Sequence, residues 1–287
     1  MFQEFSRSAP LPEVMSKMNK CRENVHTWGI KNRVIFDADK EHIIVMHPSD
    51  YHGEPFKLLG CMVDLDLRMH TCIDQLLSKI RPKSTAILRT RAYYGTADLL
   101  NQYKTHVWCL VEFNCGAYFH ASSTLLEKIS QVQRSFLTKL GLSEAVAFLD
   151  HNFAPTVLRR NIAILGLLHK RVLGLCHPAY DRLLPWWPEE SRGDRGAHGH
   201  SKQLYDHNQE ITHHWSLFNN SIFRMINIYN NLPQHVVDAT DVSEFQSILT
   251  EKARERCEQG FPQWEMSFSA RGGPEVSGIS TWIRYLS

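Results

Sequence analysis

Residues 124–141, Thr-Leu-Leu-Glu-Lys-Ile-Ser-Gln-Val-Gln-Arg-Ser-Phe-Leu-Thr-Lys-Leu-Gly, carry the clearest structural pattern in the sequence. Thr124 followed three residues later by Glu127 has the spacing of a capping box, and Gly141 is a typical helix stop. The stretch therefore predicts an amphipathic α-helix packed against other helices. Apolar residues recur between these ends at the helical spacings of three and four, and they are Leu125, Ile129, Val132, Phe136 and Leu140.

Helical patterns continue on both sides of this stretch. Pro155 should open a helix that Gly174 ends, and Pro82 should kink or divide the helix around it. Two further helices are expected, one over 217–229 and one opening at Asp241 with Glu244 in its cap. The apolar face expected upstream consists of Leu99, Leu100, Tyr103, Val107, Leu110 and Val111, and the one after Pro155 of Leu158, Ile162, Leu165 and Val172.

The first 66 residues have a mixed pattern. A helix with a core-facing stripe should run over 14–28 and stop at Gly29, since Val14, Met18, Cys21, Val25 and Trp28 recur at helical spacing. Two β-rich runs, 33–36 and 42–46, surround the polar residues 37–40 and suggest a hairpin, and 56–63 is a third strand candidate. The fold class we predict is α+β and predominantly α-helical, with a small N-terminal α/β-hairpin piece.

Composition limits the possible classes of protein. The 287 residues are 43% hydrophobic, enough for a buried core. No apolar stretch of about 18 residues and no signal-peptide layout occurs, so we expect an intracellular protein and no membrane partner. The seven cysteines include no Cys-x-x-Cys pair, which argues against a disulfide framework or a zinc ribbon and favours free, mostly buried thiols.

Charge is distributed unevenly along the chain. Residues 68–182 contain 15 Lys/Arg and 7 Asp/Glu, while the remainder contains 17 and 23, so the net charge of +2 combines a block of +8 with flanks of −6. A basic block of this kind suggests a surface for a polyanion, although basic helix faces are more often simply solvated.

Several short segments resemble, in the same order, the region that follows the catalytic aspartates in non-LTR retrotransposon reverse transcriptases. The first is 28–41, Trp-Gly-Ile-Lys-Asn-Arg-Val-Ile-Phe-Asp-Ala-Asp-Lys-Glu, and the second is 56–60, Phe-Lys-Leu-Leu-Gly. The turn at 64–67, the basic helix ending at 88–91, Glu112-Phe113 and the stretch 126–133 then follow the family's thumb. Finally, 155–160, 167–170, 229–233 and Phe245-Gln246 are similar to its C-terminal helical region.

The resemblance implies a domain order. It assigns 1–66 to the end of the palm, 67–141 to a helical thumb-like domain and 142–187 to a helical extension. Polar, glycine-rich residues 188–203 should be a flexible linker, 204–266 a C-terminal helical region and 267–287 a tail. The resemblance also places Lys40 near the phosphates of the incoming nucleotide, and it makes Phe56, Lys57, Leu58, Leu59 and Gly60 a primer grip.

The sequence departs from that family at the catalytic centre. The family binds two magnesium ions with an aromatic-x-Asp-Asp motif, because two-metal nucleotidyl transfer needs carboxylates that bridge the ions, and this sequence contains no Asp-Asp pair. We therefore expect no catalytic residue and no cofactor in this chain, with Mg²⁺ belonging to the complete enzyme. It should be an inactive part of an RNA-directed DNA polymerase that needs the N-terminal half. The alternative is a non-catalytic nucleic-acid-binding module or a degenerate retroelement remnant.

Basic and aromatic residues of the thumb-like region are the candidate contacts to an RNA template and a DNA primer. Such a surface would hold phosphates and stack on bases without reading sequence. Arg159, Arg160, Lys170 and Arg171 form a second basic cluster, continuous with the first or plain surface. The first set consists of Lys79, Arg81, Lys83, Arg89, Arg91, Lys104, Tyr93 and Tyr94.

Possible metal sites have simpler explanations. Asp64 and Asp66 could share a face of a strand, but capping the following helix is the favoured use. His106, Cys109, Cys115 and His120 have spacings near those of zinc sites, yet their apolar helix favours core thiols and histidines. The histidine-rich tract is expected to be a polar loop, with weak metal binding as its alternative, and comprises His198, His200, His207, His213 and His214.

Overall fold

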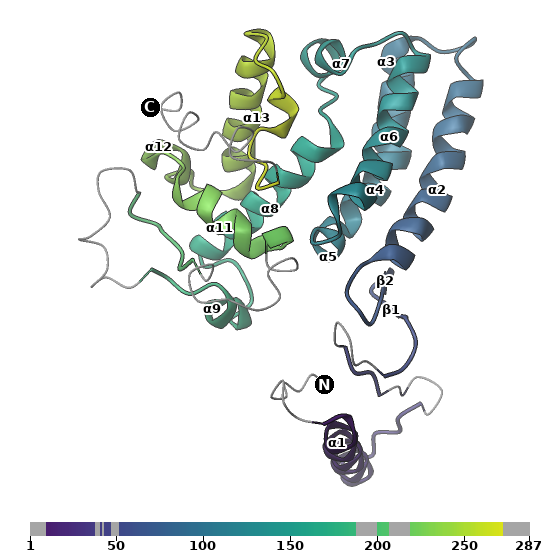
Figure 1. The fold of residues 1–287 in the computed structure, drawn as a ribbon, viewed down its shortest axis with the longest axis vertical. Helices are drawn as coiled ribbons and strands as arrows, with labels where there is room; N and C mark the ends of the chain where they lie inside the picture. The colour runs from purple at the N-terminus through teal and green to yellow at the C-terminus, as the bar shows by residue number, and fades with distance from the viewer. Residues whose placement is uncertain are drawn as a thin grey trace. The chain divides into compact units, whose positions relative to one another are not determined.

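The structure is a computed structural model that describes residues 10–37, 41, 43–46, 52–187, 200–206 and 219–271 (Figure 1). Within these ranges the chain is predominantly α-helical and contains one two-stranded antiparallel sheet, so the predicted fold class is confirmed. The chain forms two compact units, Met1–Thr71 and Cys72–Ser287. The division falls in the first turn of helix α2 (His70–Arg89).

Helix α1 (Leu11–Lys31) opens the described part of the first unit. The predicted stop at Gly29 is wrong, since the helix continues to Lys31, and a Cβ atom at Gly29 would lie 2.5 Å from Cε2 of Phe36. Glycine at this position thus makes room for the Phe36 ring, and the helix ends two residues later. The expected core stripe is also only partly correct, since Val14 is buried but Trp28 is 56% exposed.

The strands predicted at 33–36 and 42–46 are not found in the described residues. After α1 the chain folds back, and the amide of Val34 donates to the carbonyl of Gly29 at 2.9 Å, which uses a donor that a strand would need. Val45 pairs instead with His52 in an isolated antiparallel bridge. Of the predicted turn, residues 38–40 lie outside the described ranges.

The strand predicted over 56–63 is a hairpin. Strands β1 (Phe56–Leu58) and β2 (Cys61–Val63) pair antiparallel, with Phe56 opposite Val63. The two turn residues Leu59 and Gly60 both have positive φ, 47° and 87°. Positive φ at both turn positions is the pattern of the type I′ turn, whose twist matches that of the strands, so one apolar run becomes two paired strands.

Helix α2 continues through Pro82, so of the two predicted effects, a kink or a division, the division is wrong. Proline inside a helix costs about 3 kcal/mol. Burial of a large aliphatic side chain contributes about 1.5–3 kcal/mol, and α2 buries several of them on one face, including Ile73, Leu77, Ile80 and Ile87. The packing of this face outweighs the local defect.

The next helices follow with one break in period. Helix α3 (Thr96–Tyr103) continues through a π-helical turn, η2 (Lys104–Trp108), into α4 (Cys109–Phe113), and α5 (Cys115–Tyr118) comes after it. The predicted apolar face is buried except at Leu110, which is half-buried. The wider π turn shifts the register of the residues that follow it, which accounts for this exception.

Helices α6 (Ser123–Lys139) and α7 (Glu144–His151) follow, and both start at a serine cap. The Oγ of Ser122 accepts from the amide of Leu125, so the predicted capping box at Thr124 is wrong. The helix begins one residue before Thr124, and Glu127 instead pairs with Arg134. The stop at Gly141 is confirmed by its φ of 72° and by the amide of Leu142, which donates to Leu137 at 3.0 Å.

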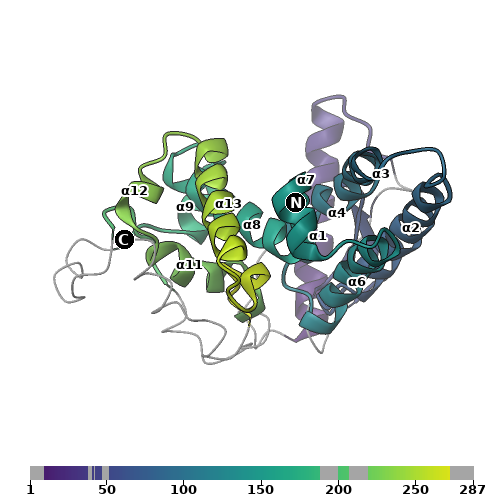
Figure 2. The same cartoon turned by 90° about the horizontal axis from the view of Figure 1, so that it is seen from above.

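Helix α8 (Thr156–Val172) lies at the centre of the rest of the second unit (Figure 2). It packs against α6, α11, α13 and η5, and Leu158, Leu165 and Leu168 are fully buried. The predicted start at Pro155 and stop at Gly174 are confirmed. The remaining elements are α9 (Ala179–Leu183), α11 (Ile222–Asn230), α12 (Gln234–Val237), α13 (Val242–Glu258) and η5 (Trp264–Met266).

The ends of the C-terminal region are fixed by polar contacts. Asp241 caps α13 by accepting from the amide of Glu244 at 2.8 Å, as predicted, and Glu244 in turn accepts from the amide of Thr240 at 2.8 Å. The segment expected to be a tail begins inside the core, because Phe268 is buried and Arg271 donates to backbone carbonyls of the loop before α6.

Candidate nucleic-acid interface

The outward face of α2 carries most of the candidate phosphate contacts. Lys79, Arg81, Lys83 and Arg89 are all exposed. The helical repeat places these four residues away from the buried face of α2, which contains Ile73, Leu77 and Ile80. Asp74 is the acidic residue of this helix. The exposed side of α2 is thus strongly positive.

Two exposed tyrosines follow this helix. Arg91 lies in the turn after α2, and Tyr93 and Tyr94 are 86% and 50% exposed. Large aromatic side chains so close to a basic surface offer flat faces on which unpaired bases can stack. Arg91 and the two tyrosines thus lie in the turn directly after Arg89, and all four residues are exposed.

The positive charges of this face have no acidic partners in the described part of the chain. Neither an ion pair nor a side-chain hydrogen bond is formed there by Lys79, Arg81, Lys83, Arg89 or Arg91, whereas other surface cations are paired, such as Arg134 with Glu127 and Lys252 with Glu255. Lysine and arginine without internal partners can give all their donors to phosphate oxygens.

Lys104 and Arg159 are held by the protein itself. Nζ of Lys104 donates to the carbonyl of His151 at 2.8 Å, and burial, followed by the charge of Arg159, lowers the pKa of this lysine. Arg159 pairs with Glu112 and lies 3.9 Å from the ring centre of Trp108. Lys104 thus ties the π turn to the end of α7, and Arg159 ties α8 to the π turn and α4, so neither side chain belongs to the open basic face.

The second basic cluster is divided by burial. Arg160 and Arg171 are 7% and 5% exposed, because α8 is enclosed on most sides. Arg171 makes an ion pair with Asp181 at 3.2 Å, and Lys170 is exposed. We therefore leave Arg160 and Arg171 out of the candidate surface: the sequence pattern identified the helix but not how completely it is covered.

The residues assigned by resemblance to the primer grip lie on the β1–β2 hairpin. Lys57, Leu58, Leu59 and Gly60 are exposed, with Leu59 at 85%, and Phe56 is half-buried. A tight turn with an exposed apolar tip and a lysine can approach another backbone closely. Lys40, the predicted nucleotide contact, lies outside the described residues.

Asp64 and Asp66 are used by the backbone. Oδ2 of Asp64 accepts from the amide of Thr71 in the first turn of α2 at 3.2 Å, and Oδ1 of Asp66 accepts from the amide of Arg68 at 3.1 Å. The favoured capping role is therefore confirmed for Asp64. Across the described ranges, no three His, Cys, Asp or Glu side chains converge closely enough to hold a metal ion.

The cysteines are less buried than expected. None of the seven forms a disulfide, but only Cys61, Cys72 and Cys257 are buried, and Cys109 is exposed. Cys109 lies on α4 directly after the π turn, where the face of the helix changes. Reading a thiol on an apolar helix as buried was therefore wrong at this position.

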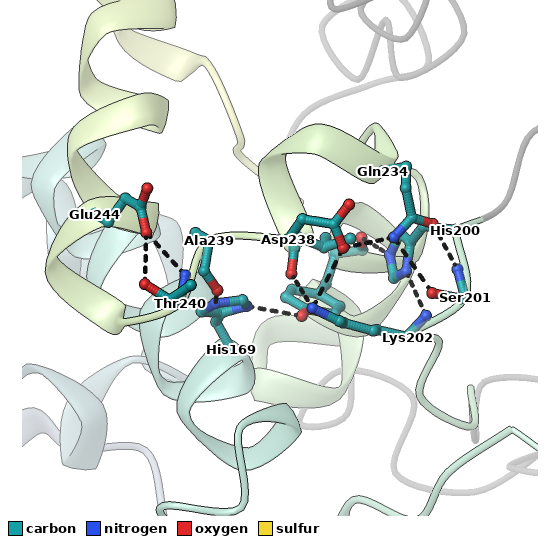
Figure 3. Close-up of polar contacts among 11 residues, drawn as sticks. His169, His200, Ser201, Lys202, Gln234, Asp238, Ala239, Thr240 and Glu244 are labelled. Carbon is teal, nitrogen blue, oxygen red and sulfur yellow. Dashed lines mark hydrogen bonds and ion pairs between the residues drawn. The ribbon is translucent and has the colours of Figure 1, made fainter.

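His200 is the described member of the histidine-rich tract, and it is buried rather than part of an exposed polar loop. Its Nε2 contacts the carbonyl of Tyr229 at 2.9 Å, and its Nδ1 accepts from the amide of Lys202 at 3.0 Å (Figure 3). Both ring nitrogens are thereby used. His198, His207, His213 and His214 lie outside the described residues.

Residues 200–206 are held in place by α11 and α12. Asn230 exchanges two hydrogen bonds with the backbone of Leu204, at 2.9 and 2.7 Å. Nζ of Lys202 donates to the carbonyl of Val237 at 2.9 Å and pairs with Asp238 at 3.4 Å. Residues 200–203, the described end of the flexible linker expected over 188–203, are therefore fixed by hydrogen bonds, and the prediction is wrong for them. Such bonds are what buried polar groups require.

Comparison with family models, curated proteins and solved structures finds no match. In the described residues no helix combines the length and the apolar character needed to cross a bilayer.

Proposed function

We propose that this chain is part of an RNA-directed DNA polymerase of the non-LTR retrotransposon type and that it binds the template–primer duplex without performing the chemistry. The observation that carries the proposal is the exposed basic face of α2, whose cations have no acidic partners among the described residues. The ordered resemblance of the sequence to that family supplies the polymerase context.

The chemistry of this face suits a nucleic-acid backbone. Cations spread along one helix can contact successive phosphates, and the neighbouring tyrosines can stack on a base at a single-stranded end. Neither contact reads base edges, so binding should be independent of sequence. The β1–β2 hairpin, with Lys57 and the exposed Leu59, would supply the primer grip.

Catalysis would require groups that this sequence does not contain. Two-metal nucleotidyl transfer needs paired carboxylates, and the sequence has no Asp-Asp pair. Magnesium and the incoming nucleotide would therefore be held by another part of the polymerase, with Lys40 approaching the nucleotide's phosphates. A non-catalytic nucleic-acid-binding module is the second candidate, because the same basic face serves both.

Salt-dependent binding tests the proposal. We would measure the affinity of the chain for an RNA–DNA duplex with a recessed primer end by fluorescence anisotropy at several salt concentrations. One variant replaces Lys79, Arg81, Lys83, Arg89 and Arg91 with glutamine. The matched control replaces five exposed cations elsewhere, Lys17, Lys20, Arg22, Lys31 and Lys139.

The expected result is a steep loss of affinity with salt, because each neutralised phosphate contributes a log–log slope of roughly −0.7 to −0.9. The α2 variant should flatten the slope by roughly one unit for each contacting residue, on every duplex sequence alike. An equal loss of affinity in both variants would mean that binding depends only on the net charge of the chain, and it would contradict the proposed interface on α2. A complementation assay with a catalytic polymerase half then separates the two candidates, because only a polymerase part should restore extension.

A further inference from the structure

Arg160 in α8 is a buried cation without a hydrogen-bond partner among the described residues. The residue is 7% exposed, and its Nε and Nη1 atoms are buried with no acceptor in the described part of the chain. Arg160 forms no ion pair within the described part of the chain. Guanidinium groups stay charged in proteins, and a buried charge is strongly unfavourable unless an opposite charge or acceptors surround it.

The described groups around Arg160 do not supply that charge. Tyr118 and Cys115 of α5 are its electrostatic neighbours. Burial raises the pKa of both groups, so each is neutral at pH 7. The Tyr118 hydroxyl already donates to the carbonyl of Val111. Glu112, the acidic residue near Cys115, is partly exposed and paired with Arg159.

A second guanidinium makes the local excess of positive charge larger. Arg271 donates to the carbonyls of Phe119, Ala121 and Asn220. Burial, and then the charge of Arg160, lowers its pKa to about 10. Two cations therefore lie near α5 and the loop that follows it, and the acceptors in contact with Arg271 are neutral carbonyls.

We propose that Arg160 forms an internal binding site for a small oxyanion, a phosphate or a carboxylate. Its planar guanidinium offers several donors in the fork geometry that such an anion accepts. The bound charge would balance Arg160 and Arg271 together. This site is separate from the exposed face of α2, which lies on a different helix and presents its cations to solvent.

Thermal unfolding of the full chain tests the site with inorganic phosphate in one arm and acetate in the other, at ionic strength held constant with NaCl. We expect a saturable rise in Tm of the native chain with at least one of the two anions, and the responding arm identifies the chemistry. Arg160→Met should be more stable than the native chain without oxyanion and should show no response. The control Arg134→Met, at a paired surface arginine, should respond like the native chain.

Equilibrium dialysis with the anion that responds keeps the proposal testable if Arg160→Met does not fold. Arg160→Lys retains the charge but loses the fork, and it should bind the anion at least tenfold more weakly. The variant with five glutamines on α2 should bind it normally, which separates this site from the proposed nucleic-acid surface. A native chain that responds to neither anion, or an Arg160 variant that binds like the native chain, would overturn the proposal.

Discussion

The hydroxyl of Tyr229 donates a hydrogen bond to Nδ1 of the buried His169 over 3.0 Å. The direction follows from the other ring nitrogen, because Nε2 lies 3.1 Å from the carbonyl of Ala239, which can only accept, and must carry the proton. His200 has the same arrangement, with Nε2 facing the carbonyl of Tyr229. Both rings are therefore neutral, and a second proton would break a hydrogen bond.

This arrangement makes the free energy of unfolding depend on pH. Burial lowers the pKa of both His169 and His200 despite the nearby Asp241, Glu244 and Asp238. Between the folded pKa and the unfolded value of about 6.5, the unfolded chain binds more protons, so stability falls as pH falls. Urea unfolding should give full stability above about pH 7 and a progressive loss from pH 6.5 downward.

Glutamine at both positions can donate and accept without titrating. The double variant His169→Gln/His200→Gln should therefore lose part of the pH dependence between pH 7.5 and pH 5.5, relative to its own value at pH 7.5. His106→Gln, at an exposed histidine, serves as the control and should leave the profile unchanged. A double variant with the native pH profile would show that other groups cause the acid lability.

We predict no primer extension by the isolated chain with Mg²⁺ or Mn²⁺, on RNA or DNA templates. The reason is chemical, because the carboxylate pair that bridges the two metal ions is absent from the sequence. A gel assay with a labelled primer measures this, with heat-denatured chain as the blank. Incorporation above the blank would contradict the proposed division of labour between this chain and a catalytic half.

Gly166 and Gln246 give a test of helix packing. A Cβ atom at Gly166 in α8 would lie 2.3 Å from Nε2 of Gln246 in α13. Alanine favours a helix over glycine by about 1 kcal/mol, but here Gln246 must move. Chemical denaturation should show Gly166→Ala as near neutral, and the same change in a Gln246→Ala background as stabilising by about 1 kcal/mol. Equal effects in both backgrounds would mean that the two residues do not compete for space.

The helices were the most predictable part of the fold, because a periodic apolar face and a glycine or proline at the end are local signals. The stretch that ends at Gly141 and the helix between Pro155 and Gly174 needed no long-range information. The start at Ser122 was missed because three consecutive residues can serve as caps, and only backbone geometry selects one. Val34 was assigned to a strand because it lies in a β-rich run. The sequence does not show that its amide donates to the carbonyl of Gly29.

Candidate contacts were predictable as residue types but not as exposed groups. Arg159 and Arg160 are adjacent in the sequence, yet Arg159 stacks on Trp108, and Arg160 is buried with no acceptor for its Nε and Nη1 atoms among the described residues. The difference comes from the helical rotation of about 100° per residue on a helix that is covered from several sides. Arg271 could not be identified from the sequence, since it lies in a glycine-rich stretch and the carbonyls that it contacts belong to residues far away in the sequence.

The central position of α8 has a consequence for how the protein is made. Its partners α11 and α13 come later in the chain. Helix α8 ends at Val172, whereas α11 begins at Ile222 and α13 ends at Glu258. At synthesis rates of about 5–20 residues per second, α8 emerges several seconds before its partners. During that interval the sides of α8 that will pack against α11 and α13 are exposed on the nascent chain. Chaperone binding during translation should therefore be concentrated on nascent chains that end between α8 and α13.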